Sequence, residues 1–91
     1  MIRRQHKAGQ VRITFTLPDH ADAGRVSVVG DFNDWTPGVH TLARRTNGTR
    51  SVAVTLRPGG VHQFRYLAEG GHWFDDPDVD DRHHDNGVLR L

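Results

Sequence analysis

The stretch from Gln10 to Leu17 alternates between polar and apolar side chains over its whole length. Successive side chains of a β-strand point to opposite faces of a sheet, so this alternation predicts a strand with one buried and one exposed face. A helix would instead repeat its apolar residues with a period of about 3.6. The face predicted to be buried carries Val11, Ile13, Phe15 and Leu17.

The rest of the chain contains further short apolar runs separated by turn residues, and no segment combines a helical period with helix caps. Short strands at intervals of about ten residues are typical of antiparallel sandwiches. We therefore predict an all-β fold, an immunoglobulin-like antiparallel β-sandwich of about seven strands. The further runs are GRVSVVG, VHTLA, RSVAVTL, VHQFRYLAE, HWF and GVLRL.

Glycine-containing sequences mark the predicted turns. Asn47-Gly48 lies between two apolar runs and predicts a two-residue hairpin turn, whose central positions both favour positive φ. Pro58-Gly59-Gly60 and Gly70-Gly71 mark two further turns. The segment from Asp75 to Gly87 is predicted to be a long loop, of a length that is often functional or mobile.

The length of 91 residues predicts a single domain. We expect residues 1–9 to form a flexible N-terminal arm, and residues 10–91 to form the folded domain. The arm begins with MIRRQHK, so contact with nucleic acid or a membrane surface is its alternative role. Lys and Arg total 12 against 11 Asp and Glu, and this net charge of +1 predicts no nucleic-acid partner.

Several absences from the sequence predict a cytoplasmic protein. The chain has no cysteine, so it can form neither a disulfide nor a thiolate zinc site. No apolar run approaches the roughly 20 residues that a membrane span needs, and the basic start does not lead into the apolar core of a signal peptide. Because the chain begins with Met1, we expect a whole gene product.

Two tryptophans follow turn sequences. Trp35 ends GDFNDW and Trp73 follows Glu-Gly-Gly-His. One interpretation is that both rings pack beneath loops, since tryptophan is highly buried on average. The alternative is a binding platform, because a flat aromatic ring suits the CH-rich face of a glucose ring.

Arg65 lies in the middle of a predicted strand, on the face opposite Phe64 and Tyr66. It is either an ordinary solvated arginine or a donor to sugar hydroxyls from a rigid strand. The acidic segment 75–85 also contains His83 and His84, so a metal-binding loop is a further alternative to a solvated acidic loop.

The sequence predicts no catalytic site. Glycosidases need two carboxylates at a fixed separation across a cleft, and so small a strand-rich chain leaves little room for one. No serine or cysteine nucleophile motif and no glycine-rich phosphate loop are present. We assign no catalytic residue, no metal ligand and no cofactor.

The segments VSVVGDFNDWTP, HQFRYLAEGGHWFDDP and NGVLRL resemble the starch- and glycogen-binding modules of carbohydrate-binding family 48, over about residues 10–91. Such modules precede the catalytic barrels of isoamylases and branching enzymes and form the glycogen-binding domain of the AMP-activated kinase beta subunit. The resemblance implies an early-set immunoglobulin-like sandwich. It implies carbohydrate-binding roles for Trp35, Arg65, Trp73 and Asn86.

The chain also departs from the kinase domain. That domain has lysine at the position of Arg65, and leucine and threonine at the positions of Arg82 and His84. The turn from Glu69 to His72 is one residue longer. An arginine fork prefers a different partner geometry from a lysine ammonium.

The resemblance implies a non-catalytic module that binds an α-1,4-linked glucan such as glycogen, starch or maltooligosaccharide. Trp35 and Trp73 would stack on glucose, while Arg65 and Asn86 would orient hydroxyls. A glycogen-metabolising enzyme in trans is a further expected partner. The alternative is a protein-interaction or packing module of the same fold that docks on a separate enzyme or kinase without binding sugar.

Overall fold

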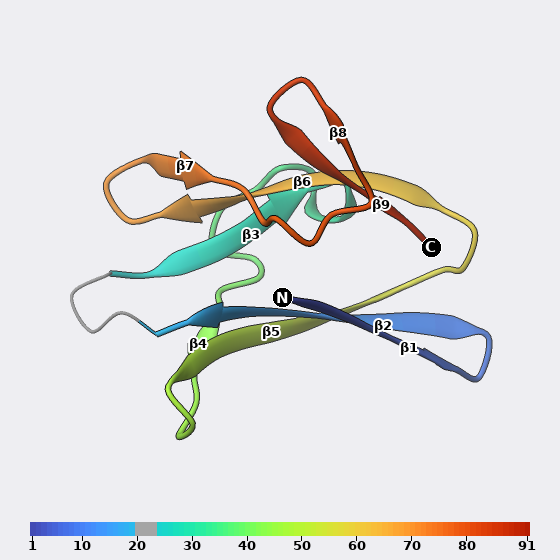
Figure 1. Ribbon diagram of the computed structural model, residues 1–91, viewed down its shortest axis with the longest axis horizontal. Coiled ribbons are helices and arrows are strands. Elements are labelled where there is room, and N and C mark those ends of the chain that lie inside the picture. The colour runs from blue at the N-terminus through green and yellow to red at the C-terminus, as the bar shows by residue number, and fades with distance from the viewer. Residues whose placement is uncertain (20–23) are drawn as a thin grey trace.

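The computed structural model describes residues 1–19 and 24–91, and these residues form an all-β sandwich of two antiparallel sheets (Figure 1). The described residues contain nine strands, more than the seven or so that the sequence predicts, and one short 3-10 helix, η1. The elements are β1 (Ile2–Lys7), β2 (Gln10–Pro18), β3 (Val26–Gly30), η1 (Asp31–Asn33), β4 (Ala43–Arg44), β5 (Thr49–Leu56), β6 (Val61–Ala68), β7 (His72–Phe74), β8 (Asp81–His83) and β9 (Asn86–Arg90).

The two sheets face each other as separate layers (Figure 1). The first sheet has the strand order β1-β2-β5-β4. The second has the order β3-β6-β9-β8, and β7 pairs with β6 beside that path. β6 is therefore the strand on which the second sheet is built, because β3, β7 and β9 all pair with it.

The core lies between the sheets and follows the alternation of the sequence. Val11, Ile13 and Phe15 of β2 are fully buried, as predicted, and Leu17 packs against them. From the second sheet, Phe64 and Tyr66 point inward and make tilted and edge-on contacts with the Phe15 ring. Aromatic pairs in these arrangements add to the hydrophobic stabilisation of a core.

β1 differs from the flexible arm that the sequence predicts for residues 1–9. Ile2–Lys7 pair with Gln10–Phe15 of β2 in antiparallel register. Ile2 packs against the core, and Arg4 forms an ion pair with Asp80 near the other end of the chain. These contacts order a segment whose polar composition carries no strand signal of its own.

The acidic segment and the asparagine-glycine turn also differ from prediction. Asp81–His83 form β8 and pair with β9, so the long loop predicted from Asp75 to Gly87 contains a strand. At the turn before β5, Arg45 donates its backbone N–H to the Thr49 carbonyl. The loop between these two residues is therefore three residues long, 46–48. Gly48, in third place, is the one residue of this loop with positive φ.

Among residues 1–19 and 24–91, no helix is long and apolar enough to cross a membrane.

Candidate functional site

The GDFNDW segment forms a tight turn whose individual residues have distinct contacts. Gly30 ends β3 so close to β6 that an added Cβ would lie 2.5 Å from the Gln63 carbonyl oxygen. The Asn33 side chain closes the turn, since it accepts from the Gly30 N–H and donates to the Val28 carbonyl. Phe32 stacks on Phe15 in the core. The turn is therefore anchored to both sheets.

Trp35 leaves this turn in a left-handed backbone conformation, with φ of 56°, directly after Asp34 with φ of 54°. A bulky residue rarely adopts this conformation, which costs roughly 1–2 kcal/mol. Its indole Nε1 donates to Asp31 Oδ1 at 2.9 Å, and the same carboxylate accepts the Gln63 backbone N–H through Oδ2 at 2.8 Å. Asp31 thus fixes the half-buried Trp35 ring to β6.

β6 and β7 place Trp73 on the outer surface of the second sheet. Trp73 pairs directly with Leu67 across the hairpin, so both side chains point to the face opposite the core. Trp73 is 41% exposed, and the Arg65 guanidinium carbon lies 5.7 Å from the centre of its ring. This separation is within the range of a cation–π contact.

A carboxylate holds the Arg65 side chain in this position. Arg65 Nε donates to Asp75 Oδ1 at 2.9 Å. The second oxygen of Asp75 lies 3.2 Å from Arg82 Nη1, so the carboxylate is shared by two arginines. Both partners of the Arg65–Asp75 pair are mostly shielded from solvent, with side-chain exposures of 22% and 28%.

Asn86 joins the same surface from β9. Its Nδ2 donates to Gln63 Oε1 at 2.9 Å. Gln63 is directly opposite Val88, and Arg65 is directly opposite Val29. Both valines are buried although they face away from the core, so polar side chains on this surface cover an apolar floor.

The structure therefore brings together the four residues predicted for the site through β6. Arg65 lies over Trp73, and Asn86 donates to the Gln63 side chain. Trp35 is joined to the Gln63 backbone only through Asp31, which accepts a hydrogen bond from each. The two indoles make no ring contact with each other in the part of the chain that the structure describes. We call this surface, made by Trp35, Gln63, Arg65, Trp73 and Asn86, the β6 surface.

Sequence reasoning missed Asp31, Gln63 and Asp75. Two of them have a signal in the sequence. Gln63 lies two positions before Arg65, so alternation alone places both on one face. Asp75 is as far after the Gly70 turn as Arg65 is before it, so hairpin symmetry predicts that they are neighbours. The dual role of Asp31 depends on the geometry of the turn and has no such signal.

The acidic segment uses its carboxylates mainly for contacts within the chain. In the described residues, no three His, Cys, Asp or Glu side chains are grouped so that they could hold a metal ion. Asp76 is buried and accepts from the Tyr66 hydroxyl at 2.6 Å. Burial, followed by this hydrogen bond, raises the pKa of Tyr66 well above its ordinary value. The hydrogen bond from Arg90 lowers the pKa of Asp81.

Comparison with known proteins finds similarity to short parts of glucan-processing enzymes, while no family model matches the chain. The chain is 43% identical over 58 residues to the 1,4-alpha-glucan branching enzyme GlgB of Salinibacter ruber, which covers 63% of the chain and 9% of that protein. It is 37% identical over 75 residues to the GlgB of Deinococcus radiodurans, covering 81% of the chain and 10% of that protein.

A third relative is the amylopullulanase of Thermoanaerobacter thermohydrosulfuricus, with 28% identity over 67 residues. That match covers 69% of the chain and 4% of the relative. The chain thus spans a tenth or less of the length of each of these three enzymes. It is similar to a small part of two proteins named as 1,4-alpha-glucan branching enzymes and of one named as an amylopullulanase.

Proposed function

We propose that this chain is a non-catalytic module of the carbohydrate-binding family 48 type, and that its β6 surface binds an α-1,4-linked glucan. The observation that carries the proposal is the position of Trp73, which is 41% exposed beside Arg65 on paired strands. The similarity to parts of two glucan branching enzymes supports the ligand class.

The chemistry of the surface suits a glucose chain. The exposed part of the Trp73 ring offers a flat apolar area to the CH-rich face of a glucose unit. Arg65 and Asn86 offer N–H donors for hydroxyl groups from strands, which hold them more firmly than loops would. Trp35 supplies a second aromatic surface at the end of β3. The partner is a glucan, and no cofactor takes part.

The affinity expected for such a surface is low. A shallow site that gains a few kcal/mol from stacking and hydrogen bonding has a Kd in the high-micromolar to millimolar range, roughly. A polymer with many equivalent glucose units raises the effective affinity, since a released module meets another site at once. Glycogen is therefore a more sensitive probe than a short oligosaccharide.

The test is co-sedimentation of the Trp73→Ala variant with glycogen. Trp73 makes no side-chain hydrogen bond in the described structure and is substantially exposed, so the variant keeps the fold. We expect the sedimented fraction to fall to the background level seen without glycogen. Unchanged sedimentation with an intact fold would contradict the proposal.

Val61→Ala is the matched control. Val61 is an exposed apolar residue, 61% accessible, on the same face of β6 as Leu67, the partner of Trp73. The six residue steps from Val61 to Leu67 span about 20 Å of strand. Removal of this apolar side chain should leave glycogen binding unchanged.

A further inference from the structure

The outer surface of the first sheet is basic and has no carboxylate among its outward-facing strand positions. The register of β1, β2 and β5 places Arg3, Lys7 and Arg12 on this side, together with amide, hydroxyl and small apolar side chains. No Asp or Glu occupies an outward position of these three strands. The surface belongs to the sheet opposite the one that carries the β6 surface (Figure 1).

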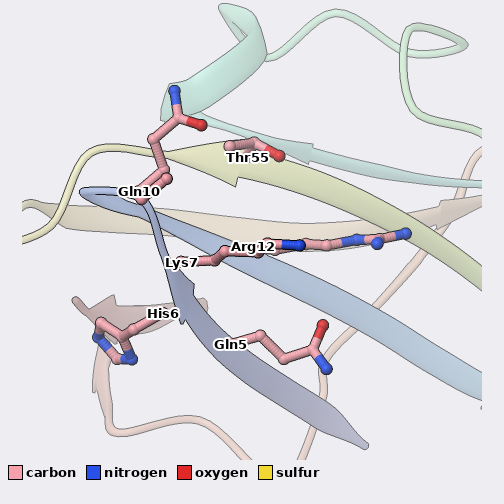
Figure 2. A pocket seen from close by; sticks show the side chains of 7 residues that line it. Gln5, His6, Lys7, Gln10, Arg12 and Thr55 are labelled. Atoms are coloured by element: carbon pink, nitrogen blue, oxygen red, sulfur yellow. The ribbon is translucent and has the colours of Figure 1, made fainter.

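Arg12 is the centre of this basic group. It lies on the middle strand, directly opposite Gln5 of β1 on one side and Thr55 of β5 on the other. Arg3 and Lys7 are its diagonal neighbours across the β1–β2 pair, within reach of long side chains. Figure 2 shows Arg12 extended along the sheet between Gln5 and Thr55.

The three cations have no ion-pair partner in the described residues, whereas Arg4, Arg65, Arg82 and other arginines are paired. Their charges therefore remain available to a ligand. A hollow of about 610 Å³ is lined by two of these cations, Lys7 and Arg12, and its lining also includes Gln5, Gln10 and Thr55. In Figure 2 these side chains surround the hollow with amide, hydroxyl and cationic groups.

We propose that this hollow binds a phosphorylated sugar, with the phosphate at Arg12 and Lys7 and sugar hydroxyls at Gln5, Gln10 and Thr55. An arginine fork binds phosphate oxygens in pairs, and a neighbouring ammonium adds a second positive charge. A ligand that carries only a carboxylate and no hydroxyl groups would leave the side chains of Gln5, Gln10 and Thr55 without partners. An apolar ligand would find no large apolar side chain, because Ala8 is the one wholly apolar residue in this lining.

The test is a nuclear magnetic resonance titration of the full chain at constant ionic strength with inorganic phosphate, a hexose phosphate and the unphosphorylated hexose. We expect saturable shifts of the backbone amides of Gln5, Arg12 and Thr55 with the hexose phosphate, at millimolar Kd as for other shallow sites. Inorganic phosphate should shift the same amides more weakly, and the hexose should not shift them.

Arg12→Gln should weaken hexose phosphate binding about tenfold, the loss that corresponds to one charge-assisted contact. Arg25→Gln is the control, because it removes the same charge from an exposed position just before β3, on the other sheet. No saturable shift, an equal loss in the two variants, or equal affinity for phosphate and hexose phosphate would each overturn the proposal. Because the site lies on the opposite sheet from Trp73, its failure leaves the glycogen test unaffected.

Discussion

The polar side chains of the β6 surface are held by neighbouring groups rather than left to solvent. Asp75 fixes Arg65 over the Trp73 ring and also contacts Arg82. Asp31 performs the same task for Trp35, whose left-handed backbone is maintained by the hydrogen bonds of the turn. Groups held in place before a ligand arrives lose less freedom when they bind it, so we expect these two aspartates to strengthen the proposed glucan binding by positioning Arg65 and Trp35.

The first prediction at this scale concerns Asp75→Asn. The substitution weakens the hold on Arg65, and the Kd for maltoheptaose should rise about fivefold, which is roughly 1 kcal/mol. The free energy of unfolding should fall by less than about 1 kcal/mol, since a partly exposed ion pair contributes little. Calorimetric titration and thermal unfolding measure the two quantities.

Asp85→Asn removes an equal charge from an exposed position, and Asp85 has no ion pair in the described structure. It should leave the maltoheptaose affinity unchanged. A similar loss of affinity in both variants would show that net charge, and not the position of Arg65, controls binding.

Tyr66 gives a prediction on alkaline stability. Its pKa is raised in the folded state, chiefly by burial, whereas an unfolded tyrosine ionises near pH 10, roughly. The contribution of Tyr66 to stability is therefore complete below about pH 10. Above that pH it falls by about 1.4 kcal/mol per pH unit, because only the unfolded chain releases the proton.

Since Tyr66 is the only tyrosine, the phenolate absorbance reports on it alone. The phenolate signal should appear together with the loss of β-sheet circular dichroism. Ionisation near pH 10 with the sheet signal intact would contradict the buried Tyr66–Asp76 hydrogen bond.

At the scale of elements, the apolar strands, the edge strand β3 included, could be predicted from sequence, and the polar edge strands β1 and β8 could not. Alternation predicts β2, β5 and β6, because each buries one face against the opposite sheet. β1 and β8 are edge strands of polar composition, and their order depends on partners distant in sequence, such as Asp80 for Arg4. The loop between the hydrogen-bonded Arg45 and Thr49 has three residues, and Asn47 in it does not adopt positive φ, so the Asn-Gly pair alone did not determine the turn type.

The prediction for β1 is protection from hydrogen exchange. As an edge strand, β1 directs about half of its amides at β2. These amides should exchange more slowly than those of an unstructured peptide, because local opening must precede exchange. If every amide from Ile2 to Lys7 exchanged at the rate of an unstructured peptide, the result would contradict strand β1 and support the flexible arm that the sequence predicts.

At the scale of the whole molecule, the two sheets present outer surfaces of different chemistry. The outer surface of the second sheet carries aromatic, amide and paired charged groups. That of the first carries Arg3, Lys7 and Arg12, which have no carboxylate partner within residues 1–19 and 24–91. The resemblance in sequence implied four of the five residues of the β6 surface, all except Gln63, but gave no information on the other sheet. That surface became visible only when the register placed residues from β1, β2 and β5 side by side.

The central claim is that the β6 surface takes a glucose chain against its tryptophans. The most direct measurement is tryptophan fluorescence of the unmodified chain titrated with maltoheptaose, since the only two tryptophans are Trp35 and Trp73. We predict a saturable quenching or blue shift as sugar covers the exposed indole of Trp73, with no response to a β-linked glucose oligomer. A flat response to maltoheptaose up to tens of millimolar, well above the roughly millimolar Kd expected for a shallow site, would contradict the claim.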